Sequence, residues 1–428
     1  MLGVDPEIYL LQDSGLANIA FVVLSIMLGI YFQDMYSELR VRSRTLVVQQ
    51  ISTALGVAFL LQSVVNYASP TTVIPRWVML IGSILSLVAL LTSRIVFSRA
   101  VLSGFQGRQL LFLGCNETVR QIVDRVGRQP ELGWSVAGFL DDQADAPALA
   151  SVRRLGAMAD LIQAVEQTKP DQIVIGLTER RQRLPMYELL DLRLGGLAIE
   201  EASATYESTH HRVSVRDLRP ADLIFAPLQG DMRRLAQVQS VYSWVFALIG
   251  FILTLPIMAI VWILVKITSP GPALYTQTRS GLLGRPFQVL KFRSMRVDAE
   301  ARTGAVWASK DDPRITPIGK WLRKLRLDEL PQFINVLRGE MNMVGPRPER
   351  PEFVRTLKEQ IPFYGQRLFV KPGLTGWAQI NHKYGDTIED TITKLEYDLY
   401  YIKHRTISLD LYIMFQTLKV MLLHRGAQ

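Results

Sequence analysis

The stretch RKLRLDELPQFINVLRGEMNMVGPRP, which runs from Arg323 to Pro348, combines a helical pattern with a concentration of charge. Its apolar residues recur at the i, i+3, i+4 and i+7 spacing of a helix that buries one face, at Leu330, Phe333, Ile334 and Leu337. Pro331 has no amide hydrogen, so a helix arriving through Trp321 and Leu325 should kink or restart there. The pattern therefore predicts a packed helical segment with Asp328 near a helix N-terminus, where unpaired amides favour phosphate groups.

Two adjacent carboxylates, Asp328 and Glu329, lie in this stretch between two sets of cations. The cations are Arg323, Lys324 and Arg326 before the pair, and Arg338 and Arg347 after it. Neighbouring helical residues point about 100° apart, so one acid can attack a substrate while the other holds a metal. A solvated acidic pair on a basic helix is the simpler alternative. Phosphate chemistry explains the surroundings better, because it needs cations and carboxylates together, and a surface helix has no need of the rigid GPRP that follows.

Length and composition indicate a membrane protein of two or three domains. The chain has 428 residues, of which 49% are hydrophobic. Its 48 Lys and Arg residues against 39 acids suit anionic lipid headgroups or phosphate-bearing substrates. Nucleic acid is disfavoured as a partner, because the apolar runs would place a DNA-binding face in a membrane. The single cysteine, Cys115, excludes an internal disulfide and any CxxC motif.

Residues 1–100 contain three uncharged or apolar stretches, Ser14 to Gln33, Ile51 to Tyr67 and Trp77 to Phe97. About 20 apolar residues cross a bilayer core, so we expect about three transmembrane helices. The first stretch lacks the basic start and cleavage site of a signal peptide and is expected to be retained. The alternative, buried helices of a soluble protein, requires three such helices side by side with basic loops.

Basic flanks predict the sides of the membrane. Arg40, Arg42 and Arg44 are expected in the cytoplasm, Pro70 to Pro75 outside, and Arg94, Arg99 and Arg108 inside. Everything after Phe97 then begins in the cytoplasm.

Residues 108–228 alternate short apolar runs, QLLFLG, WSVAGFLDD and DQIVIGL, with helical patterns, which predicts a Rossmann-like parallel α/β domain. Gly114 follows the first strand, and Asp141 or Asp142 ends the second, where a ribose could be held. The phosphate-binding pattern GxGxxG needs three glycines, and here Cys115 to Glu117 place side chains in that position. We therefore expect a domain without a dinucleotide. His210 and His211 lack acidic or cysteine partners at metal-ligand spacing.

The C-terminal part, residues 240–428, begins with the apolar run Val241 to Val265, which is long enough to span a membrane and lies within an expected helical segment at residues 241–266. A span would carry the basic, phosphate-suited region outside. Both flanks are basic, with Arg233 and Arg234 before the run and Lys266 and Arg279 after it. Pro256 lies within the run, so we expect a helix, a break and a second helix that re-enter one leaflet. An ordinary kinked span is the alternative.

The motifs KFRSM, LDELPQFINVLRGEM, VGPRP, KPGLTGWAQIN and LEYDLYYI follow one another from about Tyr242 to the C-terminus. In this order they resemble the bacterial sugar transferase family, the monotopic phosphoglycosyl transferases. The resemblance implies a re-entrant helix, a mostly α catalytic domain facing the cytoplasm, and a place in the bacterial inner membrane. It also implies transfer of a sugar 1-phosphate from a nucleoside diphosphate sugar, a UDP-linked hexose, to undecaprenyl phosphate, with Mg²⁺ and release of UMP. The lipid bilayer is then a partner, and a homodimer is possible.

The resemblance also assigns roles to single residues. Asp328 is similar to the nucleophile, Glu329 to the magnesium-binding acid, and Pro256 to the re-entrant break. Lys291, Arg293, Arg323 and Arg347 are similar to phosphate-binding residues, and Arg279 is a further cation suited to a pyrophosphate. The chain departs from the family pattern at Leu255, Asn342, Lys371 and His382.

Two other readings remain open at this point. One is a membrane-bound nucleotide-sugar oxidoreductase or epimerase that uses the α/β domain. The other is a non-catalytic scaffold for polysaccharide assembly. The sequence contains no Walker A, HExxH or GxSxG motif, so ATP-driven transport and hydrolysis lack support.

Overall fold

The structure is a computed structural model that describes residues 15–32, 44–68, 76–97, 108–129, 133–142, 152–177, 184–224, 232–297, 299, 312, 314–382 and 387–422. The described chain forms two compact units, and the second comprises residues 116–122, 175–180 and 200–428. Several residues expected to mark the sides of the membrane, Arg40, Arg42, Pro70 to Pro75 and Arg99, lie outside the described residues.

The N-terminal region consists of three helices, α2 (Gly15–Phe32), α3 (Arg44–Ala68) and α4 (Arg76–Val96), at the positions expected from the sequence. A Cβ on Gly29 would lie 2.5 Å from the carbonyl oxygen of Ala54, so α2 and α3 approach each other closely. The three helices share a small apolar core that contains Ile26, Ile30, Ile51, Leu55, Leu87, Leu90 and Leu91. The helical prediction for this region is therefore confirmed.

Whether these helices span a membrane stays a prediction. Their apolar parts, Gly15–Tyr31, Gln50–Ser63 and Leu80–Val96, have 10–17 residues each. Within the described ranges, one helix is long and apolar enough to cross a membrane, the later helix α10 (Met232–Thr268).

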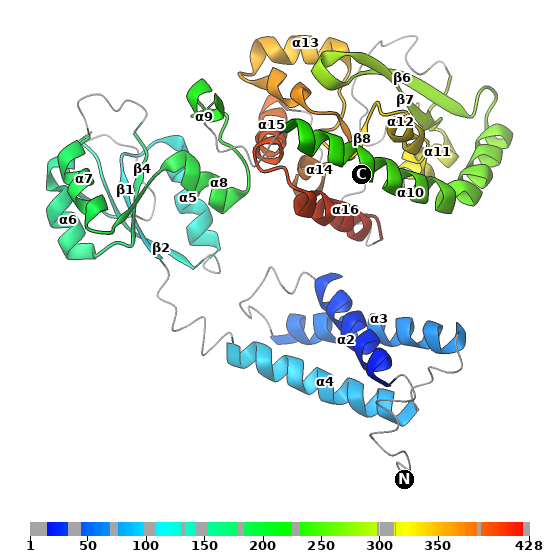
Figure 1. The fold of residues 1–428 in the computed structure, drawn as a ribbon, viewed down its shortest axis with the longest axis horizontal. Coiled ribbons are helices and arrows are strands. Elements are labelled where there is room, and N and C mark those ends of the chain that lie inside the picture. The colour runs from blue at the N-terminus through cyan, green and yellow to red at the C-terminus, as the bar shows by residue number, and fades with distance from the viewer. Residues whose placement is uncertain are drawn as a thin grey trace. The chain divides into compact units, whose positions relative to one another are not determined.

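The α/β region contains a five-stranded sheet in the order β3-β2-β1-β4-β5. The strands are β1 (Arg108–Leu113), β2 (Trp134–Leu140), β3 (Arg154–Gly156), β4 (Gln172–Ile175) and β5 (Ala198–Glu201). The connecting helices are α5 (Glu117–Arg128), α6 (Leu161–Thr168), preceded by the 3₁₀ turn η4 (Met158–Asp160), and α7 (Met186–Leu194). Strands β1, β2 and β3 pair in parallel, and Figure 1 shows α6 and α7 on the opposite side of the sheet from α5. The predicted parallel α/β architecture is confirmed.

The rest of the chain is mostly helical, as expected (Figure 1). Its helices and 3₁₀ turns are α8 (Ala202–His210), α9 (Pro220–Ile224), α10, η5 (Leu282–Gly284), α11 (Pro317–Lys324), η6 (Leu327–Glu329), α12 (Gln332–Leu337), α13 (Pro351–Gln360), η7 (Tyr364–Phe369), α14 (Trp377–Asn381), α15 (Ile388–Lys403) and α16 (Ile407–Leu422). An antiparallel hairpin joins β6 (Leu274–Ser280) to β7 (Pro286–Phe292). A parallel pair joins β8 (Asn342–Val344) to β9 (Gly373–Thr375).

Helix α10 continues through Pro256, whereas the sequence predicted two helices separated by a break. Proline removes one backbone hydrogen bond, the one to the carbonyl of Ile252, and its φ is compatible with a helix. The remaining bonds of a long helix can therefore carry it past this position. The ribbon of α10 bends along its length in Figure 1, a common consequence of proline in a helix.

Both halves of α10 pack against the same catalytic region. Ala247 in the first half is buried with Val336 and Met341. In the second half, Val261 and Val265 share a core with Met258, Ala273, Phe292, Leu322 and Leu330. Much of the remaining surface of the helix is apolar and exposed, including Ile252, Leu253, Ile260 and Ile263. This distribution suits a helix that contacts lipid on one side and packs on the C-terminal helices and strands on the other.

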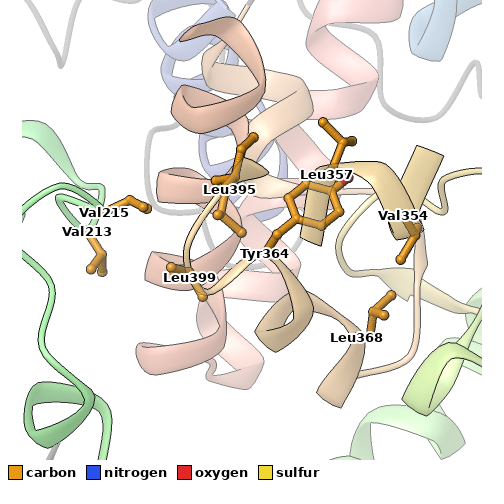
Figure 2. Close-up of a cluster of buried hydrophobic side chains, with 9 residues drawn as sticks. Val213, Val215, Val354, Leu357, Tyr364, Leu368, Leu395 and Leu399 are labelled. Carbon is orange, nitrogen blue, oxygen red and sulfur yellow. The ribbon is translucent and has the colours of Figure 1, made fainter. Parts of the chain in front are cut away.

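The segment after α8 contributes to the catalytic core. Figure 2 shows Val213 and Val215 facing Leu395 and Leu399 of α15, with Tyr364 beside them. The sequence placed these valines in the α/β domain, residues 108–228, and that boundary stays a prediction. The compact unit that holds α15 includes the chain from residue 200 onward, so it contains both valines.

Candidate active site

The hairpin β6-β7 is fastened to α12 by one buried side chain. Asn335 Oδ1 accepts a hydrogen bond from the amide of Leu290 at 3.0 Å, and its Nδ2 donates to the carbonyl of Gln288 at 2.7 Å. Asn335 is fully buried. Because these bonds fix the end of β7 against α12, the next residue, Lys291, lies beside the turn that precedes α12.

That turn carries the two carboxylates. Helix α11 ends at Lys324, and Arg326 adopts a left-handed conformation with φ of 56°. Asp328 and Glu329 follow in the single turn η6, and Pro331 leads into α12. The predicted restart of the helix at Pro331 is confirmed, while the interruption itself begins earlier, at Arg326.

Glu329 is held by two cations. Lys291 Nζ lies 2.8 Å from Glu329 Oε1, and Arg347 Nη2 lies 2.5 Å from the same oxygen. Arg347 Nη1 is 3.4 Å from the second oxygen, Oε2. Burial alone would raise the pKa of Glu329, but the charges and hydrogen bonds of Arg347 and Lys291 hold that pKa well below its usual range. Glu329 is therefore ionised at neutral pH.

Asp328 lies beside this cluster but is bonded differently. Asp328 is 7% exposed. Within the part of the chain that the structure describes, no protein group donates a hydrogen bond to its carboxylate. Burial, together with the negative charge of Glu329, raises the pKa of Asp328 above its ordinary value. Lys291, Arg323 and Arg347 oppose that rise through their positive charge. The two neighbouring acids therefore have distinct environments, which suits distinct tasks.

The position of Arg347 is fixed by the VGPRP segment. The amide of Gly345 donates to the carbonyl of Thr375 at 2.9 Å, and the amide of Gly373 donates to the carbonyl of Pro346 at 3.0 Å. A Cβ on Gly345 would lie 2.5 Å from the carbonyl oxygen of Lys371, so only glycine fits there. The segment thus extends the β8-β9 pair and points the Arg347 side chain at Glu329.

Other predicted phosphate-binding residues lie in different surroundings. Arg293 is 4% exposed and donates to the carbonyls of Ser269 and Pro270, so it closes the turn after α10 and the structure does not bring it to the carboxylates. Arg279 contacts Glu349 Oε2 and the carbonyl of Pro348, both at 3.3 Å. Their roles toward phosphate remain untested predictions. Arg323, by contrast, lies close enough to act on the charge of Asp328.

The donor set at the turn can be tested against Mg²⁺. This ion prefers carboxylate oxygens, uses one or two of them, and completes its coordination with substrate phosphates and water. Among the described residues, no group donates to the oxygens of Asp328, and Glu329 Oε2 has one contact, with Arg347 at 3.4 Å. The described residues contain no cluster of three or more acids, histidines or cysteines. The pair fits a magnesium ion that arrives with a phosphate-bearing substrate.

Sequence reasoning missed a buried ion pair behind the VGPRP segment. Arg367 and Asp398 are 8% and 2% exposed, and Arg367 Nη2 donates to the carbonyl of Arg347 at 2.9 Å. Asp398 had a usable signal, because it falls on the buried stripe of α15 at helical spacing with Leu395 and Leu399. Arg367 lies in a 3₁₀ turn that has no comparable pattern.

In and near the turn between β1 and α5, side chains of the protein accept hydrogen bonds from backbone amides. Gly114 has a φ of 84°, and the amide of Cys115 donates to Asp141 Oδ2 at 3.1 Å. Asp142 accepts the amide of Met158 at 2.9 Å, and the amide of Val119 donates to Asn116 Oδ1, also at 2.9 Å. Acidic and amide side chains thus bond to the backbone where a dinucleotide fold would hold phosphate and ribose.

Comparison with known proteins agrees with this combination of an apolar helix and a cationic carboxylate site. The model of the family described as bacterial sugar transferase matches residues 234–424, and a model described as CoA-binding domain matches residues 31–184. An Aeromonas hydrophila UDP-N-acetylgalactosamine-undecaprenyl-phosphate N-acetylgalactosaminephosphotransferase is 34% identical over 395 residues, which cover 87% of this chain and 86% of the relative. The Escherichia coli (strain K12) UDP-glucose:undecaprenyl-phosphate glucose-1-phosphate transferase is 33% identical over 320 residues, 73% of this chain and 68% of the relative.

A shorter relative shares the catalytic part at higher identity. The Bacillus subtilis (strain 168) putative undecaprenyl-phosphate N-acetylgalactosaminyl 1-phosphate transferase is 54% identical over 123 residues, 29% of this chain and 68% of the relative. These likenesses define a membrane-associated sugar-phosphate transferase. The chain belongs to the bacterial sugar transferase family.

Proposed function

We propose that this protein transfers a hexose 1-phosphate from a UDP-sugar to undecaprenyl phosphate in two steps, with Asp328 as the nucleophile. The reaction gives undecaprenyl-diphosphate sugar and UMP and starts the assembly of a polysaccharide. Membership of the family supports the overall reaction. The relatives named above differ in their sugar, N-acetylgalactosamine in one and glucose in another, so the proposal extends to the class of UDP-hexoses.

One observation carries the assignment of Asp328. Its buried carboxylate has no hydrogen-bond donor among the described residues, whereas Lys291 and Arg347, two of the three cations near it, bind Glu329. A nucleophile needs a free lone pair, and an oxygen already bonded to a guanidinium is a poorer one. The geometry therefore favours Asp328 for attack and Glu329 for holding charge.

In the first step a carboxylate oxygen of Asp328 forms a bond to the phosphorus that bears the sugar. The bond from that phosphorus to the oxygen bridging the two phosphates breaks, and the electron pair leaves with UMP. Lys291, Arg323 and Arg347 supply positive charge around the phosphoryl oxygens, where negative charge increases during the transfer. These cations also favour the ionised form of Asp328, which the attack requires.

In the second step an oxygen of undecaprenyl phosphate attacks the same phosphorus. The new bond completes the lipid diphosphate, and the bond to Asp328 breaks, which regenerates the carboxylate. Two successive displacements at one phosphorus give ping-pong kinetics, because UMP can leave before the lipid binds.

Glu329 is the residue proposed to hold Mg²⁺. When bound, the ion neutralises charge on the donor's diphosphate and stabilises the leaving group. The two cations on Glu329 keep its carboxylate ionised and oriented, so that it can present oxygen Oε2 to an ion that the donor brings.

The active site is proposed to face the cytoplasm at the inner membrane of a bacterium. The long apolar helix α10 supports membrane association. Arg233 and Arg234 near its start and Lys266 near its end are basic flanks, and cytoplasmic loops carry an excess of Lys and Arg. Both halves of the helix also pack on one core, and the ribbon of α10 bends along its length in Figure 1, which suits a bent helix whose two ends lie at the same leaflet.

The test is to trap the intermediate. Purified protein is mixed with a UDP-hexose labelled in the phosphate next to the sugar, without undecaprenyl phosphate, and the label is sought on the peptide that contains residue 328. We expect label on the wild type and none on Asp328→Asn, which keeps the shape of the side chain and removes the nucleophile. Donor binding should be largely retained. Substantial turnover by Asp328→Asn would show instead that the lipid phosphate attacks directly.

A further inference from the structure

Arg367 and Asp398 form an ion pair between η7 and α15, two elements that contribute side chains to the apolar cluster of Figure 2. Arg367 Nη2 lies 2.8 Å from Asp398 Oδ2. Arg367 belongs to η7 between Tyr364 and Leu368, and Asp398 precedes Leu399 on α15. Figure 2 shows Tyr364 and Leu368 of η7 and Leu399 of α15 within this apolar cluster. The charges are therefore largely removed from water.

Among the described residues, the guanidinium of Arg367 has three partners, and one of them, Arg347, belongs to the VGPRP segment. Its Nη1 donates to the hydroxyl of Tyr364 at 2.9 Å, and its Nη2 lies 2.8 Å from Asp398 and 2.9 Å from the carbonyl oxygen of Arg347. Because a guanidinium is planar and rigid, fixing two of these directions fixes the third. The backbone of Arg347 is thus held from behind by a buried charge.

We infer that Arg367, oriented by Asp398, is a positioning residue that places Arg347 on Glu329. The inference rests on the proposed function, since it concerns the same site. Arg347 Nη2 reaches Glu329 Oε1 at 2.5 Å, so its backbone carbonyl and its side chain connect the buried pair to the catalytic turn. Neither Arg367 nor Asp398 touches the carboxylate pair in the described structure, so the effect must pass through Arg347.

The chemistry of the pair favours this role over a purely structural one. A buried ion pair costs much desolvation, and apolar side chains of similar size would often stabilise a core as well or better. Burial raises the pKa of Asp398 to about 6, against the opposing charge of Arg367, so the carboxylate is ionised at neutral pH. What an apolar replacement could not supply is a directed donor to the carbonyl of Arg347.

A second arginine, Arg279 of β6, also contacts the end of the VGPRP segment. Arg279 Nη1 donates to the carbonyl of Pro348 at 3.3 Å and pairs with Glu349. Consecutive carbonyls, those of Arg347 and Pro348, are thus each held by an arginine. A pocket borders these residues and is lined in part by Ser280, Pro346 and Arg367. The segment is held from two sides, and Arg367 provides the buried one.

The experiment is a double-mutant cycle on the first half-reaction. The rate of UMP release in a single turnover is measured for wild type, Arg367→Met, Arg347→Ala and the double variant, at saturating UDP-hexose and Mg²⁺. Arg367→Met should lower the rate about 10- to 100-fold, the range seen when supporting residues of a site are removed. If Arg367 acts through Arg347, the double variant should be no slower than Arg347→Ala alone.

Milder variants keep the test decisive if Arg367→Met does not fold. Arg367→Lys retains the charge but has no planar fork, and Asp398→Asn retains the shape but not the charge. Each should show a smaller loss of rate that also disappears in the Arg347→Ala background. A loss that multiplies with that of Arg347→Ala, or a normal rate in a folded Arg367→Met or Arg367→Lys protein, would overturn the inference.

The chain offers a matched control two residues away on α15. Glu396 is also buried, and it pairs with Arg212 at 3.3 Å, but its other partners are Tyr206 and the amide of Val215. Glu396→Gln should lower the melting temperature without coupling to Arg347→Ala. Coupling of similar size in this control would show that any defect in α15 disturbs the site and would remove the special role of Arg367. The trapping experiment of the preceding subsection separates this inference from the proposed function. If wild-type protein carries no labelled sugar phosphate on the peptide that contains residue 328, the two-step mechanism is wrong, whatever the double-mutant cycle shows.

Discussion

Lys291 Nζ lies 2.8 Å from Glu329 Oε1, although 38 residues separate them in the chain. The contact depends on the register of the β6-β7 hairpin, in which Lys291 pairs with Tyr275, and on Asn335, which fastens β7 to α12. The hairpin directly follows the long apolar helix. The charge at the catalytic turn is therefore set by the strand that the membrane-associated helix leads into.

Removing either cation from Glu329 should slow the reaction strongly. Lys291→Ala and Arg347→Ala each take away positive charge that offsets the developing charge on the phosphoryl group. We expect a loss of roughly 100- to 1000-fold in kcat, the cost typical of removing one such group. Lys324→Ala is the matched control, because Lys324 is an exposed cation at the end of α11. Rates of UMP release would check this. Equal losses in Lys324→Ala would mean that only the general positive field matters.

The sequence predicted the carboxylate pair, its cations and the helix restart because these features are local. Asp328, Glu329 and Pro331 lie within a stretch of four residues. A cluster of charges and the effect of a proline on a helix can both be recognised over so short a stretch. The placement of Arg293 could not be predicted in the same way. KFRSM presents Lys291 and Arg293 two residues apart, yet one reaches Glu329 while the other closes the turn after α10. Only the packing of β7 decides between them.

The break expected at Pro256 shows a second limit. Charge and length favoured two short helices, but a long helix loses only one hydrogen bond to a proline. Thr254 Oγ1 donates to the carbonyl of Gly250 at 2.7 Å, a bond to the residue four positions earlier that often accompanies a bend in a helix. Packing of both halves of α10 on one core then favours continuity. Such tertiary support is not visible in hydropathy.

Both ends of α10 should lie on the cytoplasmic side. Single cysteines at Arg234 and at Leu283, in a background without Cys115, should react with an impermeant thiol reagent from the same side of sealed inverted vesicles. Leu283 is 59% exposed in the turn between β6 and β7, so labelling there should not require unfolding. A cysteine pair that reacts from opposite sides would establish an ordinary span.

The α/β region should bind dinucleotides or coenzyme A weakly at most, although a CoA-binding model matches it. Asp141 already accepts the amide of Cys115, so an incoming phosphate would meet a carboxylate. Calorimetry on the whole protein with NAD and with coenzyme A should give no binding in the micromolar range. Asp141→Asn removes the charge and serves as the comparison. Micromolar binding by wild type would contradict the prediction and favour the oxidoreductase reading.

The attachment of α8 to the catalytic helix α15 should depend on pH through Glu207. Lys403 Nζ lies 2.7 Å from Glu207 Oε1 and 2.9 Å from Oε2, and His404 Nε2 lies 3.2 Å from Oε2. Burial alone would raise the pKa of Glu207, but the hydrogen bonds and charges of His404 and Lys403 overcome it and lower that pKa below its ordinary value of 4.5. The ionised carboxylate is therefore favoured in the folded protein.

A carboxyl group whose pKa is lower in the folded state binds fewer protons there than in the unfolded state. The contribution of Glu207 to the free energy of unfolding is therefore fully present above pH 4.5, its ordinary pKa, and is lost as the pH falls through the pKa of the folded protein. Glu207→Gln should lower the free energy of unfolding at neutral pH by roughly 1.5–3 kcal/mol, the range for hydrogen bonds to charged groups. The difference in melting temperature between wild type and Glu207→Gln should then shrink as the pH is lowered below 4.5. Glu359→Gln, an exposed change on α13, should show no such dependence. A difference that stays constant down to the acid limit of folding would mean that the hydrogen bonds of Glu207 do not depend on its charge.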